Sequence, residues 1–271
     1  VELVFGLDSN DQAKNERNGK RVIEMLLALP DDFSLEYQPG DTIGLLVPNE
    51  AGAVSFVLEG LRENHGILPT QKVSIDEGHP ITVEQAIREN VDLCSVLKNK
   101  KILNGLAQFA TNEEEATALR FLASKDSSGA AAFQKYVIDQ CRSFTDILRD
   151  FPSCRSITIE GILSLLPAIP PRYYSISSSP LDDGRKNCLS IAFSVVDYLT
   201  PSLKLNGFES GRRRMHGLAT SYLEAICAPF IMDCADKLKE HPELKIFPKP
   251  TAEFRLPPSL STPIVLIGPG T

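Results

Sequence analysis

Apolar positions fall into three blocks along the 271-residue chain, and each block predicts a different kind of secondary structure. In the N-terminal part, apolar runs at Arg21–Leu29 and Thr42–Val47 are separated by turn residues, which predicts strands. In the middle of the chain, apolar positions recur at helical spacing. After Pro167, short runs at Arg172–Ser177 and Leu189–Val196 predict strands again. This order predicts a β-barrel interrupted by a helical insertion.

Within the central block, local signals place individual helices. Residues 51–63 have amphipathic spacing, and Ala131–Asp150 carries an apolar stripe at i, i+3 and i+4 that predicts one helix. Thr82, with Gln85 three positions later, matches a capping box at a helix start. A last helix is expected over residues 158–166.

Polar segments between the apolar runs predict loops. Tyr37–Asp41 is expected to form a tight turn, because its proline fixes φ and its glycine tolerates positive φ. Asp182–Gly184 predicts another turn. Gly207–Gly217 is polar and basic and predicts a loop. Its arginines Arg212–Arg214 are expected on a solvated surface, ahead of a short helix over Thr220–Ala228.

Composition and charge narrow the functional classes. Hydrophobic residues make up 42% and charged residues 23%, the balance of a globular protein. The formal charge of −7 argues against binding of nucleic acid or anionic membranes, since both need basic surfaces. No apolar run approaches the roughly 18 residues that span a bilayer.

The cysteines predict the cellular compartment of the protein, and the chain ends predict whether it is part of a longer chain. Six scattered cysteines without a CxxC pair indicate reduced thiols in a cytoplasmic protein. No histidine-rich or cysteine-rich cluster indicates a metal site. The opening residues do not resemble a signal peptide. The chain stops where a new unit is expected to begin, so we expect it to be part of a longer protein.

The stretch Pro171–Pro180 carries a cation, two aromatic rings and several hydroxyls in one extended segment. Side chains alternate along a strand, so Arg172 and Tyr174 share one face, and Tyr173 and Ser175 share the other. A flavin nucleotide needs such groups: positive charge for its pyrophosphate, a flat ring for stacking and hydroxyls for ring nitrogens. A solvent-facing strand with aromatic packing is the alternative, which spacing alone leaves open.

Two later stretches contain glycines in patterns that hold phosphates. Gly217–Leu223 places small residues before a predicted helix, whose first N–H groups attract anions. Ile264–Thr271 is an apolar run leading into a Gly-Pro-Gly-Thr turn, as in many nucleotide-binding α/β lobes. An ordinary threonine-capped helix and an ordinary turn are the alternatives. The four histidines are far apart and no GxSxG elbow is present, so a hydrolase triad has no support.

Taken together, the segments RYYSISSSP, GLATSYL and FRLP…TPIVLIGPGT resemble the reductase module of the diflavin reductases, over about residues 20–271. The pattern Y-x-x-G-D at Tyr37–Asp41, followed by Pro48 and Asn49, and the sequence FPS at Phe151–Ser153 agree with this resemblance. Tyr222 departs from it, because the family usually has tryptophan there.

The resemblance implies an α+β fold. Its parts are a flattened antiparallel FAD-binding β-barrel of ferredoxin-reductase type, an inserted all-helical connecting domain, and the first strand of a truncated NADPH-binding α/β lobe. The barrel is expected at residues 1–80 and 168–258, the helical domain at 81–167 and the start of the NADPH-binding lobe at 259–271.

The resemblance also implies roles for individual residues. Arg172 would bind the FAD pyrophosphate, Tyr174 would stack on the isoalloxazine ring, and Ser175, the predicted catalytic residue, would hydrogen-bond near flavin N5. Further FAD contacts are implied for residues beside these, along the strand that lines the flavin, near the adenine and at the phosphate loop: Tyr173, Ala192, Phe193, Ser194, Tyr198, Gly217, Leu218, Ala219 and Thr220. NADPH contacts are implied for Arg21, Gly270 and Thr271. No metal ligand is implied.

The resemblance implies an NADPH-dependent flavoprotein oxidoreductase. NADPH would deliver a hydride to FAD. FAD would pass electrons to FMN in a domain outside this chain, and from there to an acceptor protein such as methionine synthase or a cytochrome P450. Ala192 and the pair Cys141-Arg142 differ from the residues usual in P450 reductases and favour the methionine synthase reductase branch. We do not expect this module alone to complete the reaction.

Other functions stay open at this point. The sulfite reductase flavoprotein is a further branch of the same family. A degenerate barrel that acts only as a docking module is an alternative from a different class, and it would lack a flavin absorption band. A single-flavin reductase of ferredoxin-reductase type is a third alternative, against which the helical insertion argues.

Overall fold

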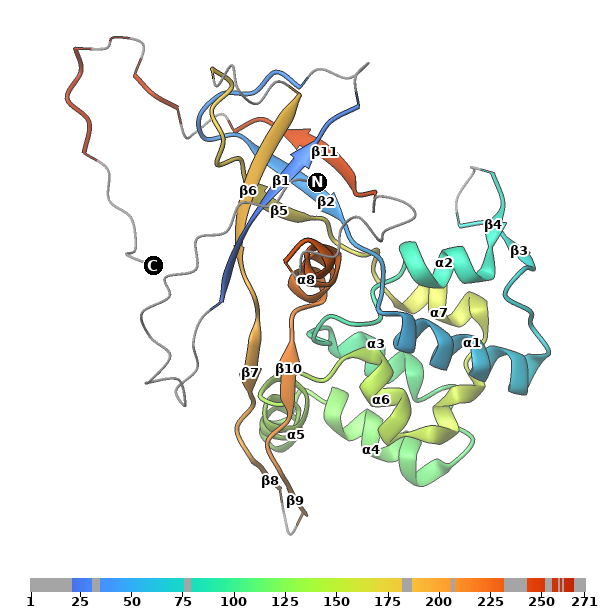
Figure 1. The fold of residues 1–271 in the computed structure, drawn as a ribbon. Coiled ribbons are helices and arrows are strands. Elements are labelled where there is room, and N and C mark those ends of the chain that lie inside the picture. The colour runs from blue at the N-terminus through green and yellow to red at the C-terminus, as the bar shows by residue number, and fades with distance from the viewer. Residues whose placement is uncertain are drawn as a thin grey trace.

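The computed structural model describes residues 21–30, 35–75, 79–181, 187–205, 208–231, 243–251, 255–257, 259 and 261–265. Antiparallel sheets gather on one side of the molecule and short helices on the other (Figure 1). One further helix, α8 (Leu218–Ile231), lies against the sheets. The predicted mixture of helices with antiparallel sheets is therefore confirmed.

The strands beside α8 form two antiparallel sheets. They are β1 (Val22–Ala28), β2 (Thr42–Leu46), β5 (Arg172–Ser175), β6 (Cys188–Ser194) and β11 (Lys245–Lys249). β1 pairs with β6, with Val22 opposite Ser194, and β2 lies between β11 and β5. An isolated bridge between Ile176 and Ile191, and a hydrogen bond from the Ser177 amide to Ser190 O at 2.8 Å, link the two sheets. Within the described residues the sheets do not close into the expected barrel.

The sheets and α8 enclose one hydrophobic core, because alternate strand residues point inward. Ile43 and Leu45 of β2 and Ile191 of β6 are completely buried in it. Leu223 and Cys227 contribute from α8 and are also completely buried. This packing fixes α8, and with it the first turn of the helix, against β2 and β6.

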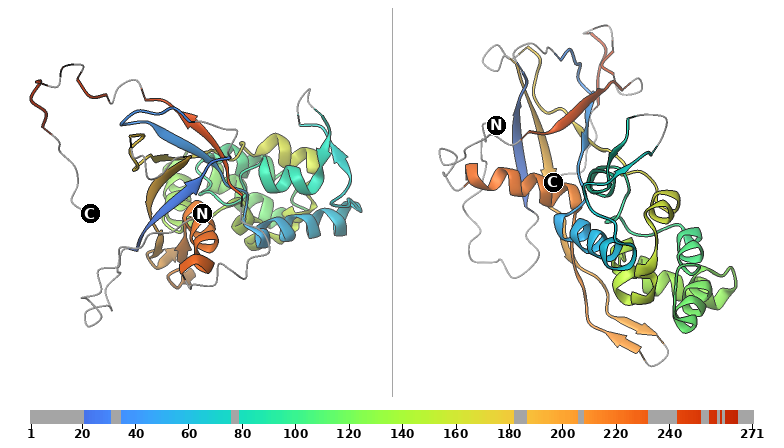
Figure 2. Two further views of the ribbon diagram at one scale, coloured as in Figure 1. Left: turned by 45° about the horizontal axis from the view of Figure 1, so that its top comes forward. Right: turned by 90° about the vertical axis from the view of Figure 1, so that its right-hand side faces the viewer.

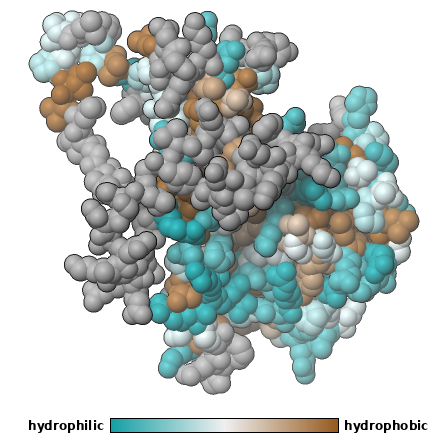
Figure 3. Space-filling model, in the orientation of Figure 1, coloured by the Kyte–Doolittle hydropathy of each residue, from teal (hydrophilic) through white to brown (hydrophobic). Residues whose placement is uncertain are grey.

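The helices on the other side form what we call the helical cluster. Its members are α1 (Ala51–His65), α2 (Val83–Glu89), α3 (Lys100–Leu106), α4 (Glu113–Ala123), α5 (Ser127–Phe133), α6 (Phe144–Asp150) and α7 (Ile159–Leu165). They share a second core that includes Leu61, Ile87, Leu119 and Phe144. A short hairpin of β3 (Lys72–Val73) and β4 (Ile81–Thr82) stands beside α2 (Figure 2). Hydrophilic residues cover much of the cluster in Figure 3.

The predicted single helix over Ala131–Asp150 is wrong, because the chain interrupts it. α5 is followed by a π-helical turn over Gln134–Ile138, and α6 begins anew after Ser143. Cys141 has a φ of 49°, a left-handed conformation that a right-handed helix does not accommodate. Ser143 forms a capping box with Asp146, which favours a new helix start at this point.

The predicted loop over Gly207–Gly217 is also wrong, because it contains two short strands. The strands of this region form two antiparallel pairs, β8 (Leu203–Leu205) with β9 (Phe208–Ser210) and β7 (Asp197–Leu199) with β10 (Arg214–His216). Arg214 and Asp197 form an ion pair with two hydrogen bonds: Arg214 Nε donates to one carboxylate oxygen of Asp197 at 2.8 Å and Nη2 donates to the other at 2.7 Å. This cross-strand pair stabilises a strand that polarity alone does not predict. α8 is longer than the predicted helix over Thr220–Ala228.

Several local predictions are confirmed. Tyr37–Asp41 contains the expected turn, in which Gly40 has a φ of 95° and the Asp41 amide donates to Gln38 O at 3.0 Å. Thr82 caps α2 by accepting a hydrogen bond from the amide of Gln85. Helices cover residues 51–65 and 159–165, close to the predicted limits.

Other predictions fall outside the described residues. These are the turn over Asp182–Gly184 and most of the predicted last strand, of which residues 264–265 are described and are not in a strand. Among the described helices, none is both long enough and apolar enough to cross a bilayer.

Candidate functional site

A cavity of about 480 Å³ lies at the first turn of α8, within the usual size range of ligand pockets. Its walls come from the β2–α1 connection, α2 and the start of α8: Pro48, Asn49, Glu50, Ala51, Arg88, His216, Gly217, Leu218, Ser221 and Tyr222. The first helical bond of α8 runs from the Ser221 amide to Gly217 O at 2.9 Å. The preceding amides of Leu218, Ala219 and Thr220 therefore have no acceptor within the described residues. Such a helix start favours an anion.

Gly217 lets the chain close tightly at this turn. Its amide donates to Val196 O at 3.1 Å, while the Val196 amide donates to Thr220 Oγ1 at 3.1 Å. A Cβ at Gly217 would lie 2.6 Å from Thr220 Oγ1 and 2.9 Å from Val196 Cβ. The backbone after β6 and the first turn of α8 are thus held in direct contact only because residue 217 has no side chain.

Tyr174 and Ser175 flank the open edge of β5. The Tyr174 ring packs edge-on against Phe193 of β6, with centroids 6.1 Å apart, and burial raises the pKa of Tyr174. Ser175 is exposed on the opposite face. Neither hydroxyl has a hydrogen-bond partner within the described part of the chain. Because β5 is an edge strand, its outer backbone groups are also open to a ligand.

Tyr173 points to the outer face of the sheet. Its ring lies edge-on to Phe247 of β11, at a centroid distance of 6.2 Å, and Lys249 Nζ stands 3.7 Å from its centroid. Phe247 covers Gly44 of β2 so closely that a Cβ there would be 2.3 Å from the ring. Tyr173 therefore has packing partners on the face opposite to Tyr174.

Arg172 is held near the helical cluster. Its guanidinium donates to Pro170 O at 2.7 Å and to Ser95 Oγ at 3.4 Å. No carboxylate within the described residues pairs with it, so its charge is available to an anionic ligand. Pro170 lines a second cavity, of about 270 Å³, that shares Pro48 and Tyr222 with the cavity at α8.

The strand predicted to line the flavin follows the alternation expected of β6. Ala192 is exposed, Phe193 is buried and Ser194 is half-buried. Tyr198 of β7 is exposed, and its hydroxyl lies 3.2 Å from Cys141 Sγ. The hydrogen bond with Cys141, together with burial, raises the pKa of Tyr198.

Of the three residues predicted to contact NADPH, the structure describes Arg21. Arg21 forms an ion pair with Glu224 of α8. Gly270 and Thr271 lie outside the described residues.

The fold brings some of the residues predicted to bind FAD close together. Tyr174, Phe193, Leu218 and Ala219 pack in or against the same hydrophobic core, so β5, β6 and the first turn of α8 meet. Arg172, two residues before Tyr174, contacts the side of the helical cluster through Ser95 Oγ. Tyr198 likewise contacts the helical cluster, through the Cys141 thiol.

The predicted solvated position is confirmed for Arg212 and Arg214, which are exposed, but not for Arg213, which is half-buried. All three also have polar partners that the sequence did not indicate. Arg213 pairs with Asp146 of α6 at 2.7 Å, Arg214 pairs with Asp197, and Arg212 Nε donates to Thr200 O at 3.1 Å. Their acceptors come from distant parts of the sequence, so local polarity could not identify them.

Arg88 and His216 line the cavity at α8 and were not singled out from the sequence. A single arginine near the end of a helix and a single histidine at the end of a strand belong to no motif, so only their place beside the cavity reveals them.

Comparison with known proteins gives the family. The model of the FAD binding domain family matches residues 7–222. NADPH–cytochrome P450 reductase of Drosophila melanogaster is 32% identical over 196 residues, covering 71% of this chain and 25% of that protein. Methionine synthase reductase of Bos taurus is 31% identical over 292 residues, covering 100% of this chain and 39% of the relative.

The flavoprotein alpha-component of sulfite reductase [NADPH] from Pectobacterium atrosepticum is 29% identical over 271 residues, 100% of this chain and 37% of that protein. The chain therefore belongs to the FAD-binding domain family of the diflavin reductases. It spans about a quarter to two fifths of the length of these relatives.

The described residues fit FAD on chemical grounds. Three amides without acceptors and an unpaired guanidinium suit a pyrophosphate. A half-buried phenol beside an open strand edge suits a flat ring that carries hydrogen-bonding groups. FAD is the cofactor of this family of domains.

Proposed function

We propose that this chain is the FAD-binding module of an NADPH-dependent diflavin reductase. The observation that carries the proposal is that Tyr174 and Phe193 share one hydrophobic core with the first turn of α8, whose amides lack acceptors within the described residues and lie beside the cavity. Membership of the FAD-binding family supports it. When bound, FAD accepts a hydride from NADPH and releases electrons singly, so this chain's task is to bind and orient it.

The residues divide this task between them. The amides of Leu218–Thr220 and the charge of Arg172 hold the pyrophosphate, and Tyr174 supports the isoalloxazine ring. Ser175 donates a hydrogen bond near flavin N5, and Tyr198 stands near the adenine. Ala192, Phe193 and Ser194 line the ring, while Arg21, Gly270 and Thr271 contact NADPH.

The proposal extends to the organisation of the whole protein. The FAD-binding barrel occupies residues 1–80 and 168–258, the connecting domain 81–167, and an NADPH-binding lobe begins at 259. The two separate cores support a barrel unit and a helical unit, but they move the first boundary from residue 80 to Asn49. Since α1 packs in the core of the helical cluster, we place the structural junction between the two cores at Asn49.

We further propose that the full protein is cytoplasmic and passes electrons through an FMN-binding domain to methionine synthase. Similarity to methionine synthase reductases along the whole chain supports this acceptor. The five described cysteines are free thiols, in keeping with a reducing compartment. A cytochrome P450 is the alternative acceptor, supported by the similarity to P450 reductases.

The first test is flavin binding by the purified chain. We expect a flavin absorption band and saturable binding of added FAD. Arg172→Ala should weaken FAD binding by on the order of tenfold or more, because a charge-assisted contact is lost. Arg120→Ala is the matched control, since Arg120 pairs with Glu113 on the exposed side of α4. A chain that binds no FAD would favour a docking module instead.

A second test concerns Ser175 and needs the full-length protein. We expect Ser175→Ala to slow the reduction of FAD by NADPH, measured by stopped flow, while FAD stays bound. Thr42→Ala is the control, because Thr42 faces Ser175 across the β2–β5 pair. An unchanged reduction rate in the Ser175 variant would remove its catalytic role.

A further inference from the structure

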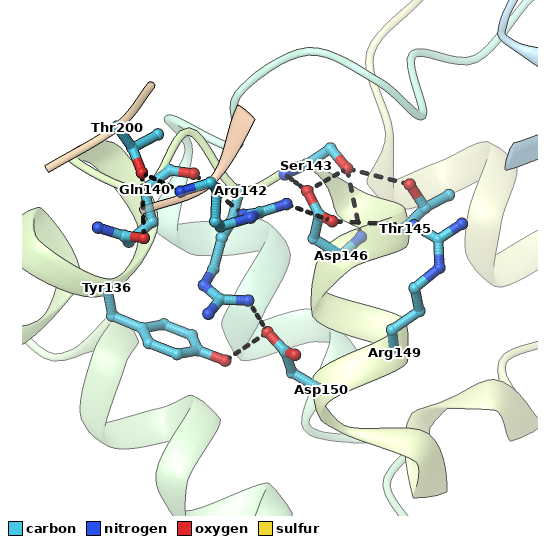
Figure 4. A network of polar contacts seen from close by, with 10 residues as sticks. Tyr136, Gln140, Arg142, Ser143, Thr145, Asp146, Arg149, Asp150 and Thr200 are labelled. Carbon is cyan, nitrogen blue, oxygen red and sulfur yellow. Dashed lines mark hydrogen bonds and ion pairs between the residues drawn. The ribbon is translucent and has the colours of Figure 1, made fainter. Parts of the chain in front are cut away.

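A polar network joins the helical cluster to the strand that leads into α8. Gln140, Ser143 and Asp146 lie on the helical side, and Thr200 follows β7 (Figure 4). Gln140 is almost fully buried, and its Nε2 donates to Pro201 O at 2.8 Å. The end of β7 is therefore tied to the helical cluster through buried hydrogen bonds.

Arg213 connects the same network to β10. Its backbone amide donates to Thr200 Oγ1 at 2.9 Å and its carbonyl accepts from the Thr200 amide at 2.8 Å. Its guanidinium pairs with Asp146 at 2.7 Å and donates to Gln140 O at 3.0 Å. Both side chains of the ion pair are mostly buried, with 25% and 16% of their surface exposed. A planar guanidinium with two partners fixes its backbone more firmly than a flexible ammonium would.

Asp146 has two functions in this arrangement. One carboxylate oxygen accepts from the Ser143 amide at 2.9 Å and completes the capping box of α6. The other oxygen receives Arg213. The start of α6 and the start of β10 are thus fixed by one side chain.

β10 ends at His216, and Gly217 follows directly with the amides of the proposed phosphate site. We propose that Arg213 is a positioning residue: through Asp146 and Gln140, the helical cluster sets the place of the loop that binds the FAD phosphates. This proposal rests on the proposed FAD-binding function. On this proposal, the helical cluster contributes directly to the affinity for flavin.

The test compares Arg213→Ala with the parent chain for three ligands, FAD, ADP and riboflavin. ADP carries the pyrophosphate and adenine part of FAD, and riboflavin carries the ring without a phosphate. We expect the affinities for FAD and ADP to fall on the order of tenfold, the loss of one charge-assisted contact, while riboflavin affinity changes less than about twofold. Arg213→Lys should recover part of the loss, because it keeps the charge but not both contacts.

Arg149→Ala is the matched control. Arg149 also approaches Asp146, at 3.8 Å, but it belongs to α6 itself and does not reach β10. Its removal should leave all three affinities unchanged. Equal affinities for FAD and ADP in Arg213→Ala and the parent would overturn the proposal, as would equal losses for ADP and riboflavin.

A measurement without flavin separates this proposal from the proposed function. In the flavin-free chain, Arg213→Ala should speed amide hydrogen exchange over residues 214–221 by about tenfold, because local opening becomes easier, with exchange in α4 unchanged. If the parent chain bound no FAD, the proposed function would fail, and exchange would still decide the role of Arg213. Unchanged exchange over residues 214–221 would overturn that role.

Discussion

Gly217 illustrates how a single residue controls the proposed phosphate site. We predict that Gly217→Ala weakens FAD binding by on the order of tenfold, because the new methyl group would collide with Thr220 Oγ1 at 2.6 Å and with Val196. Titration with FAD measures the effect. Gly211→Ala is the control, since a Cβ at Gly211 meets no atom within 4 Å. Equal affinities in the two variants would show that the tight turn at Gly217 does not matter for binding.

Individual thiols should differ sharply in reactivity. Burial raises the pKa of Cys154 to about 12 and that of Cys227 to about 11, and only the thiolate reacts quickly. Cys141 and Cys188 are half-exposed. We predict that iodoacetamide at neutral pH modifies Cys141 and Cys188 well before Cys154 and Cys227. Mass spectrometry of timed samples measures this order, and early labelling of Cys154 would contradict the packing described here.

At the scale of single elements, the start of α5 depends on a titrating cap. The Asp126 carboxylate accepts hydrogen bonds from the Gly129 amide, at 2.6 Å, and from the hydroxyls of Ser128 and Ser124. These bonds, led by that from Gly129, lower the pKa of Asp126 from 3.8 to about 2. A carboxylate with a lowered pKa stabilises the fold above its unfolded pKa and loses this contribution as the pH falls toward 2.

We therefore predict a pH-dependent difference between the parent chain and Asp126→Asn. Near pH 6 the parent should melt at a higher temperature, because its charged cap binds the amide more strongly. The difference should shrink as the pH falls from about 4 to about 2. Melting curves recorded across this range check the prediction. A difference that stays constant down to pH 2 would mean that the cap does not titrate as described.

At the scale of the whole molecule, the two cores are joined through Asn49. This residue is almost fully buried between β2 and α1, and its Nδ2 donates to Ile87 O at 2.8 Å and to Val91 O at 2.6 Å. Its Oδ1 accepts from the Leu93 amide at 3.2 Å. One side chain thus links the segment leaving the sheets to three backbone groups of the helical cluster.

We predict that Asn49→Ala lowers the free energy of unfolding by about 2–3 kcal/mol, because buried backbone groups lose their partner. Urea denaturation measures the change. Asn64→Ala is the control, since Asn64 bonds Gly60 O and Arg155 O from a more exposed position, and we expect less than about 1 kcal/mol there. Equal losses in both variants would argue against a special role for Asn49.

Secondary structure followed from the sequence wherever the determining residues are neighbours in the chain. The Tyr37–Asp41 turn and the Thr82 cap depend on residues within a few positions, and both were predicted correctly. The interruption at Cys141 was missed, because the apolar stripe continues across it. The period of apolar residues reports which side of a helix is buried, and it does not report whether the backbone stays helical.

In the candidate site, too, the local motifs could be predicted from the sequence, whereas contacts between distant segments could not. The sequence motifs identified β5 and the start of α8, and they gave the family that the comparisons confirmed. The assignment of single side chains to FAD stays a prediction. The contact between Tyr174 and Phe193, the free amides beside a cavity and the position of Arg172 near Ser95 required the fold.

By itself, the sequence determined the class of fold, the strands β1, β2, β5 and β6, several helices and the family, because these depend on local periodicity and on ordered motifs. Only the tertiary structure decided where Arg212–Arg214 are held and which residues unite the two cores. Asp146 and Arg213 are 67 positions apart in the sequence but 2.7 Å apart in space. Such a partnership is created by packing, and the pattern of neither segment alone contains it.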